Sequence, residues 1–392
     1  LKKIAIIKTN AFKNSVINTL NIYGVETIDK GAFYECKINS INIYDSSYMC
    51  DDNCIYRDDQ LIYYKPNRKN AKIPVSIKRV CNHSIDLTNA TSLEVSGEVN
   101  FDERSVYNAT NVKKLICNKS NLTRIADLFE DASNIKELVY EGDEIPNKYL
   151  SKLSGVKKIT LNSSIKSIGD FSFSQNISLK EIVNFEKACN YGDFILMDCV
   201  SLEKILFNDN SNSVGYHLVE GCSNLKTIEI PLLEYYYNLN NDIHDILGDG
   251  TLNPEIIISK GDIPQKMFMN LTNPIVIKQS PIRIGANAFE NATNITVKLD
   301  NTKYIGDETF KNSVLSRMIE LKNCEYIGDN AFVNCKGIKE IHLFEKINYI
   351  GNNAFMGTQL GNLSIKENQN YYIEQNCLFK NKDLLFYIPN SR

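Results

Sequence analysis

The chain has 392 residues, a formal net charge of −3 and 43% hydrophobic residues. This charge balance argues against a nucleic-acid-binding surface and against a polybasic patch for a membrane surface. No apolar run approaches the roughly 18 residues that a membrane-spanning helix needs, so we expect no membrane span. The first residue is Leu1, and we therefore expect a processed or truncated N-terminus.

A short strand pattern, I-x-L, recurs along the whole chain with a period of about 22 residues. A repeat of this length is typical of a solenoid, in which each coil buries its apolar face against the coils before and after it. The first core residues of the expected strands are, in chain order, Leu20, Ile41, Leu93, Leu115, Leu138, Ile159, Ile182, Ile205, Ile228, Ile256, Ile275, Val297, Ile319, Ile341 and Leu363.

The N-terminal coils are predicted at residues 1–43, and a junction follows at residues 44–72. The junction contains the segment 53–66, NCIYRDDQLIYYKP, in which apolar strands flank a polar turn, as in a β-hairpin. The segment 376–389, NCLFKNKDLLFYIP, is a near copy of it. We expect this second hairpin, within residues 366–392, to cover the exposed edge of the last coil.

The main ladder is predicted at residues 73–365, with an insertion at residues 231–255 that carries clustered tyrosines and acidic residues. Loops rich in tyrosine are often contact sites, so Tyr235, Tyr236 and Tyr237 are candidate partner-binding residues. The alternative is a degenerate coil whose tyrosines pack on the ladder. The acidic residues of the insertion lack the order of a calcium-binding loop and are interpreted as solvated charges; they are Asp242, Asp245 and Asp249.

The clearest single repeat is residues 326–343, YIGDNAFVNCKGIKEIHL. Gly328 is expected to allow a sharp turn, with positive φ if required. Asp329 is a candidate N-cap for one short helical turn that carries Phe332 into the core. Cys335 then occupies a small inward position, and a half-buried strand follows it.

The eleven cysteines are predicted to be mostly free, buried thiols. Several fall in the small inward position of the repeat, which holds Ala or Ser in other coils and is therefore selected for size. These cysteines are Cys36, Cys199, Cys222 and Cys335. Cys50 and Cys54 are close enough in sequence to be the alternative, a disulfide pair.

Motifs that carry chemistry are absent from the sequence. The four histidines do not have the spacing of a zinc hydrolase, and no phosphate-binding loop or nucleophile elbow is present. We therefore expect no catalytic residues, no metal site and no cofactor. An enzyme with a site in the insertion, at residues 235–250, is a weaker alternative.

The outer face of the predicted sheet holds the remaining candidate site. The position before each strand core alternates in charge, as in Lys158 and Glu181, which favours pairing between neighbouring strands. The position between the two core residues is apolar or β-branched in five successive coils, which predicts an exposed apolar stripe that binds a partner. Its residues are Ile116, Val139, Thr160, Val183 and Leu206. The alternative is lateral packing within the sheet, without a partner.

The repeat resembles the BspA-like, Treponema-type leucine-rich repeats, whose pattern runs roughly L-x-x-I-x-I-P-x-x-V-x-x-I-G-x-x-A-F-x-x-C. The matching stretches are residues 73–80, 164–173, 225–231, 304–313, 326–343 and 349–365. The resemblance implies a right-handed solenoid with a parallel β-sheet on one face, short helical or irregular turns on the other, and a C-terminal hairpin cap. It also implies a protein that is displayed at the cell surface or secreted and binds other proteins, in several members host matrix.

The sequence and the resemblance together predict a non-enzymatic, adhesion-type protein that binds a protein partner, such as a host-matrix or cell-surface protein, on its strand face. The alternative is an intracellular scaffold or sensor that uses the same face. Mostly free cysteines are compatible with that compartment.

Overall fold

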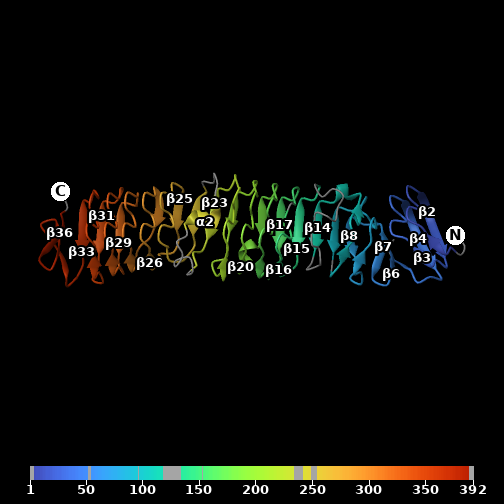
Figure 1. Cartoon of the computed structure of the whole chain (residues 1–392), viewed down its shortest axis with the longest axis horizontal. Helices are drawn as coiled ribbons and strands as arrows, with labels where there is room; N and C mark the ends of the chain where they lie inside the picture. Colours follow the sequence, from blue (N-terminus) through green and yellow to red (C-terminus); the bar gives the residue numbers. More distant parts are fainter. Residues whose placement is uncertain are drawn as a thin grey trace. The chain divides into compact units, whose positions relative to one another are not determined.

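The computed structural model of the chain is a parallel β-solenoid with very little helix, which confirms the predicted fold class (Figure 1). The structure describes residues 4–51, 54–95, 97–117, 134–151, 153–233, 242–248 and 254–387. The chain divides into two compact units. The first comprises Leu1–Ala188 with Phe194–Leu202, and the second Cys189–Asp193 with Glu203–Arg392.

The coils contribute one longer strand each, and within each parallel sheet these strands pair in chain order. In the first unit these strands are β2 (Val16–Tyr23), β4 (Lys37–Tyr44), β8 (Asn70–Ile73), β11 (Ser92–Val95), β14 (Lys114–Cys117), β15 (Glu137–Tyr140), β17 (Lys158–Leu161) and β19 (Glu181–Val183). In the second unit they are β21 (Lys204–Leu206), β23 (Thr227–Ile230), β24 (Glu255–Ile258), β25 (Pro274–Ile277), β27 (Asn294–Val297), β29 (Met318–Leu321), β31 (Glu340–Leu343) and β33 (Asn362–Ile365).

A second, two-residue strand occurs in most coils and pairs in the same parallel way. In the first unit these strands are β1 (Ile6–Ile7), β3 (Thr27–Ile28), β9 (Arg79–Val80), β10 (Ile85–Asp86), β12 (Asn100–Phe101), β13 (Val106–Tyr107), β16 (Glu144–Ile145) and β18 (Ser167–Ile168). In the second unit they are β20 (Asn190–Tyr191), β22 (Ser213–Val214), β26 (Arg283–Ile284), β28 (Tyr304–Ile305), β30 (Tyr326–Ile327) and β32 (Tyr349–Ile350).

Two groups of three antiparallel strands lie at the positions predicted for the hairpins. The first consists of β5 (Met49–Asp51), β6 (Cys54–Arg57) and β7 (Gln60–Tyr64), and the second of β34 (Tyr371–Glu374), β35 (Cys377–Lys380) and β36 (Asp383–Tyr387). The first sheet also joins the parallel rows, because β7 pairs with both β9 and β10.

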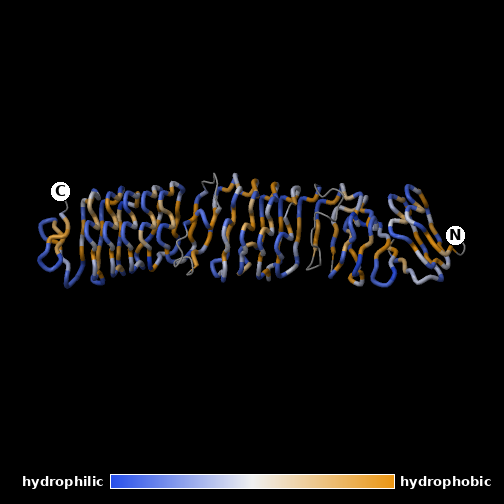
Figure 2. Tube along the Cα trace, in the orientation of Figure 1, coloured by the Kyte–Doolittle hydropathy of each residue, from blue (hydrophilic) through white to orange (hydrophobic). Residues whose placement is uncertain are grey.

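Aromatic rings stack from coil to coil inside the second unit. Phe332 is fully buried, as predicted, with its ring centroid 5.2 Å from that of Phe310 and 5.7 Å from that of Phe355. The column continues through Phe289 and Phe268 at 5.2 Å per step. Hydrophobic segments recur in each coil along the chain trace (Figure 2). The core is therefore continuous within the unit, because each coil buries its apolar residues against those of its neighbours.

The turns around this aromatic column are not helical. Among the described residues, the helical elements are α2 (Ile243–Leu247) and the short 3-10 turns η1 (Ala109–Asn111) and η3 (Phe185–Lys187). Near Phe332 the chain turns instead at Asn330 and Asn334, whose φ angles are 55° and 53°. Asparagine tolerates this left-handed conformation better than most residues, because its short side chain can bond locally.

The role predicted for Asp329, a helix N-cap, is wrong. Its carboxylate oxygen Oδ1 accepts a hydrogen bond from the Asn352 N–H of the next coil at 2.7 Å. The Asp329 N–H in turn donates to Oδ1 of Asp307 in the preceding coil at 2.9 Å. The I-G-D turn thus links three successive coils, and its carboxylate satisfies backbone donors that no strand ladder reaches.

Gly328 is required by close packing and not by a positive φ. A Cβ atom at this position would lie 2.6 Å from the backbone nitrogen of Asp307 in the preceding coil. Real side chains do not come that close to backbone, so only glycine fits. Gly351 has the same environment one coil later, where a Cβ would lie near the nitrogen of Asp329.

Two strand positions differ from the predicted ladder. In β27 the first core residue is Ile295, which pairs with Ile275, whereas the prediction placed Val297 there. A pattern with a period of two residues fits equally well when it is shifted by two, so the sequence did not separate these alternatives. The strand β8 was missed, because its core residue Ala71 lacks the size of the Ile or Leu expected there.

We expect Gly328→Ala to destabilise the protein by about 1–3 kcal/mol, because the new methyl group overlaps the backbone of Asp307. The matched control is Gly361→Ala, where a Cβ would meet only the Lys339 carbonyl oxygen at 3.7 Å. That change should be neutral or stabilising by up to about 1 kcal/mol. Unfolding in denaturant measures both, and equal stabilities of the two variants would contradict the packing argument.

Candidate functional site

The outer face of the sheet in the first unit brings four of the candidate residues together. Ile116 pairs with Val139, Val139 with Thr160, and Thr160 with Val183, on the successive strands β14, β15, β17 and β19. All four side chains are half-buried. At the usual spacing of parallel strands the row is about 14 Å long. It forms a shallow apolar surface that neighbouring side chains partly shield.

Charged side chains border this row. The residues one position earlier on the strands alternate in sign and pair as Lys114↔Glu137 and Lys158↔Glu181. Lys158 Nζ lies 2.9 Å from a carboxylate oxygen of Glu181, and both side chains are largely exposed. Exposed pairs of this kind add little stability, at most about 1 kcal/mol. Their position gives the apolar row a polar border, an arrangement found in protein interfaces.

In the second unit the equivalent row is mixed. Leu206 is 37% exposed and pairs with Glu229 on β23. The Glu229 carboxylate forms an ion pair with Lys278, which places charge inside the row. Ile257 and Val276 follow on β24 and β25 and are half-buried. Leu206 therefore lies on an interrupted surface, and the continuous apolar row is that of the first unit.

The structure describes residues 231–233, 242–248 and 254–255 of the insertion. Tyr235, Tyr236 and Tyr237 lie outside the described residues, as does Asp249. The helix α2 buries Ile243, Ile246 and Leu247, and Asp242 caps it by accepting a hydrogen bond from the His244 N–H at 2.7 Å. Three backbone bonds join α2 to residues 217–219. This part of the insertion is an ordinary piece of coil, and the Asp242 carboxylate serves the helix end.

A depression in the N-terminal coils was not identified from the sequence. It has a volume of about 710 Å³. Its lining includes Tyr23, Glu26, Asp45 and Arg57. Tyr23 stacks on Tyr44 with ring centroids 4.7 Å apart. The signal in the sequence was the recurrence of N-I-Y at the ends of β2 and β4, which places matching side chains side by side.

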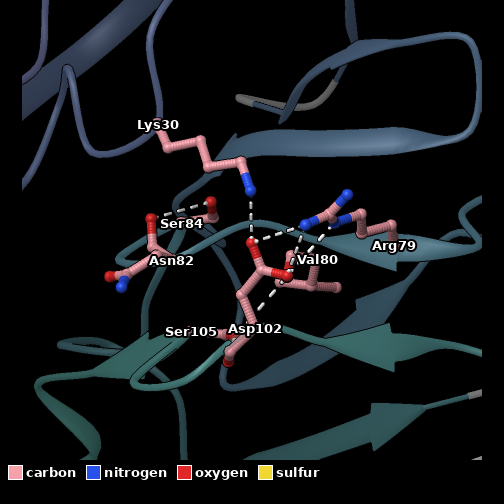
Figure 3. Close-up of polar contacts among 7 residues, drawn as sticks. All are labelled: Lys30, Arg79, Val80, Asn82, Ser84, Asp102 and Ser105. Atoms are coloured by element: carbon pink, nitrogen blue, oxygen red, sulfur yellow. Dashed lines mark hydrogen bonds and ion pairs between the residues drawn. The ribbon is translucent and has the colours of Figure 1, made fainter.

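A group of ion pairs lies where the N-terminal coils meet the following coils (Figure 3). Asp102 receives a hydrogen bond from Lys30 Nζ at 2.7 Å and another from Arg79 at 3.0 Å. Burial alone would raise the pKa of the Asp102 carboxyl, but the bonds and charges of Lys30 and Arg79 outweigh it and lower the pKa. The three residues come from different coils, so this group fastens the junction.

A second ion pair at the same junction is buried. Lys65 Nζ lies 3.1 Å from a carboxylate oxygen of Asp86, whose side chain is only 2% exposed. The other carboxylate oxygen accepts bonds from Thr88 and Asn108. Losing one partner of such a pair is costly, since the other charge is left buried. Because its bonds are made within the junction, the Lys65–Asp86 pair has a structural role. Elsewhere, too, the described residues contain no group of three or more side chains that could together bind a metal ion.

The cysteines are free thiols, in agreement with the sequence-based expectation, and Cys50 and Cys54 are not bonded to each other. Cys335 is buried in the core, as expected for its inward position, and Cys117 is buried as well. Burial raises the pKa of Cys117 to about 12 and that of Cys335 to about 11. Thiols with such values are poor nucleophiles and poor metal ligands, because the reactive form is the thiolate.

Comparison with known proteins gives a consistent family match. A family model described as "BspA type Leucine rich repeat region" matches in six copies, over residues 1–70, 143–240 and 261–385. No curated protein matches the chain. The described residues include no helix that is both long and apolar enough to cross a membrane.

Several solved structures are similar to the chain at low identity. A leucine-rich repeat protein from Bacteroides ovatus is 16% identical, with 79% of this chain and 90% of that chain covered and a TM-score of 0.30. A leucine rich cell surface protein from Faecalibacterium prausnitzii is 15% identical, with 81% and 94% covered and a TM-score of 0.31. The leucine-rich repeat protein of T. pallidum is 12% identical, with 62% and 84% covered and a TM-score of 0.26.

We expect Asp102→Asn to lower stability at neutral pH and to make it less sensitive to acid. A lowered pKa in the folded state contributes stability above the unfolded value, about 3.9, and that contribution is lost as the pH falls through the folded value. The stability difference between the native chain and the variant should therefore shrink below about pH 4. Unfolding in denaturant at several pH values measures it.

The control for this prediction is Asp58→Asn, because the Asp58 side chain is 88% exposed. The free energy of unfolding of the Asp58→Asn variant should equal that of the native chain at every pH. A difference between the native chain and Asp102→Asn that stays constant down to low pH would show that the carboxylate charge does not fasten the junction.

We expect the buried thiols to be protected by burial and not by disulfides. In the folded protein, Cys117 and Cys335 should react with a thiol reagent at least about tenfold more slowly than an exposed thiol. In denaturant without reductant, all eleven cysteines should react. Mass spectrometry counts the labels, and a deficit that persists in denaturant would reveal disulfides.

Proposed function

The chain belongs to the family of BspA-type leucine-rich repeat proteins, and on that premise we propose that it is a non-enzymatic, adhesion-type protein that binds a protein partner. The proposed binding surface is the outer face of β14, β15, β17 and β19. The proposed location is the cell surface or the extracellular space, where proteins of this family occur. The partner class is a host-matrix or cell-surface protein.

The observation that carries the proposal is the apolar row with its charged border. Ile116, Val139 and Val183 are half-buried on three of the four strands in register, so they remain accessible without disturbing the core. Such a row offers a partner apolar area that is ordered in advance, and binding therefore costs little conformational entropy. The alternating charges beside it would orient the partner and contribute to specificity more than to affinity.

An intracellular scaffold or sensor that uses the same face is the second candidate. It is favoured by the free cysteines, because free thiols persist in reducing compartments, whereas extracellular proteins more often contain disulfides. Protease treatment of intact cells that produce the chain separates the two locations. Digestion before lysis supports surface display, and protection until lysis supports the intracellular candidate.

We expect Val139→Lys combined with Val183→Lys to abolish binding to immobilised extracellular-matrix extract or to host cells. Each lysine would lose its water in an apolar contact without a partner, at a cost of several kcal/mol. In the free protein the long side chains reach water, so the melting temperature should change little. Surface plasmon resonance and circular dichroism measure the two effects.

The matched control is Ile257→Lys combined with Thr296→Lys. These residues occupy the same strand position in the second unit, on either side of Val276, as Val139 and Val183 lie on either side of Thr160. Binding should survive in the control. Equal loss in both double variants, or retained binding with an intact fold in the first, would place the interface elsewhere.

A further inference from the structure

Four successive coils of the first unit carry a lysine at the same position, two residues before the first core residue of the strand. We call these residues the lysine row: Lys113, Lys136, Lys157 and Lys180. The Lys136 N–H donates to the Lys113 carbonyl oxygen at 2.8 Å. The Lys157 N–H donates to that of Lys136 at 2.8 Å, and the Lys180 N–H to that of Lys157 at 2.9 Å. The row therefore runs from coil to coil over about 14 Å.

Most side chains of the lysine row are open to solvent. Lys113, Lys157 and Lys180 are exposed, and Lys136 is half-buried. The Lys113 ammonium donates to the Thr110 carbonyl oxygen at 3.3 Å. Neither Lys157 nor Lys180 forms an ion pair with any residue that the structure describes. Their charges are therefore available to an anion from outside the chain.

The next position along the same strands has the opposite design. Lysine and glutamate alternate there from coil to coil, and Lys158 Nζ lies 2.9 Å from a carboxylate oxygen of Glu181. Opposite charges on neighbouring strands stabilise a sheet, whereas like charges destabilise it. The alternating position thus supports the fold, while the lysine row opposes it. The need to fold therefore does not explain the lysine row.

The equivalent position in the second unit carries no such run of lysines. It reads, in chain order, Glu203, Lys226, Pro254, Asn273, Thr293, Arg317, Lys339 and Gly361. Lys226 Nζ lies 2.6 Å from a carboxylate oxygen of Glu203, so opposite charges meet there. The whole chain has a net charge of −3. The concentration of positive charge is thus a local feature of the first unit.

The surroundings of the lysine row limit the shape of an anion that it can hold. On the strand side, Glu137 and Glu181 interrupt any second line of positive charge. On the other side, two residues before each lysine, the side chains are uncharged: Asn111, Asn134, Gly155 and Ser178. Asparagine and serine can bond to hydroxyl groups. The row therefore suits one narrow, extended polyanion that also carries hydroxyl groups.

Nucleic acid matches this surface less well. Proteins bind single strands largely through aromatic rings on which the bases stack. The strand positions beside the lysine row are aliphatic or Thr160, as the apolar row shows. A duplex is wider than one row of lysines, so its phosphates would also lie over Glu137 and Glu181, where like charges repel. A polysaccharide chain avoids both difficulties.

We propose that the lysine row binds an extended sulfated polysaccharide whose chain runs along the row from coil to coil. The ammonium groups of Lys157 and Lys180 contact sulfate groups, and the side chains of Asn134 and Ser178 bond to sugar hydroxyls. The choice of a sulfated polymer rests on the proposed function, because such polymers occur in host matrix and on cell surfaces. The lysine row and the apolar row are separate surfaces of the same strands.

Binding of the purified chain to heparin, measured by surface plasmon resonance at several salt concentrations, tests the proposal. The affinity should fall by more than about tenfold between about 50 and about 200 mM salt, because binding to a polyanion releases its counterions. Lys157→Gln combined with Lys180→Gln should weaken binding at low salt by more than about tenfold. The melting temperature of this variant should stay equal or rise, since a repulsion between like charges is removed.

Two further double variants make the test specific. Lys157→Arg combined with Lys180→Arg keeps both charges and should bind heparin as the native chain does. Lys226→Gln combined with Lys339→Gln removes two charges from the same strand position in the second unit, where the neighbouring coils carry no lysine. It should also bind as the native chain does. Circular-dichroism melts check that every variant is folded.

The proposal is overturned if the native chain does not bind heparin or if the folded Lys157→Gln, Lys180→Gln variant binds it normally. It is also overturned if the Lys226→Gln, Lys339→Gln control loses binding equally. Equal affinity for desulfated heparin would exclude sulfate recognition, and tighter binding of single-stranded or duplex DNA would identify nucleic acid as the ligand class instead.

The same measurements separate this proposal from the protein-binding function. Val139→Lys combined with Val183→Lys leaves the lysine row intact, so it should bind heparin at least as well as the native chain. Salt separates the two surfaces in matrix extract, because high salt screens sulfates from the lysines and leaves an apolar contact in place. The loss of binding expected for the apolar-row variant is therefore measured in high salt, and heparin binding in low salt.

Discussion

The parallel hydrogen-bonded register between one coil and the next is the constraint on which the rest of the structure depends. It places equivalent residues of successive coils side by side. The side chain at each position must therefore pack against the equivalent side chain of the next coil, about 4.8 Å away. Phe310 and Phe332 can stack because both are flat, and Gly328 must lack a side chain because the backbone of Asp307 lies against it. The repeat pattern in the sequence is the direct consequence of this register.

The sequence was sufficient to predict the parts of the fold that depend on side-chain size and on the period of the repeat. Phe332 was predicted to be inward because an aromatic residue recurs at its position in neighbouring coils, and Cys335 because a small residue recurs at its position. The hairpins were found because one copies the other. The sequence did not resolve features that depend on contacts between coils. Asp329 resembles a helix cap locally, and only its distance to Asn352 reveals its actual partner. Ala71 was missed because a small core residue carries no periodic signal.

The sequence predicted where the candidate binding surface lies, but not how exposed its side chains are or where charge interrupts it. Alternation along a strand places Val139 and Val183 on the outer face, and the structure agrees. Alternation does not indicate how far neighbouring strands shield such side chains, and they are half-buried. The interruption at Glu229 depends on Lys278, which lies two strands away, and the local sequence contains no signal for that contact.

The column of asparagines beside the aromatic stack has a consequence for how such a chain changes length. Asn291, Asn312 and Asn334 have φ angles of 60°, 57° and 53°, and their side-chain amides bond in series, the last two over a spacing of 22 residues. Loss of one whole period between them would bring equivalent atoms together again and leave the column unbroken. Loss of a few residues leaves it unbroken only where a turn outside the column absorbs the change, as in the steps of 21 and 22 residues that join these asparagines. Gene rearrangements that add or remove complete coils therefore change the length of the protein without disturbing the contacts within the column.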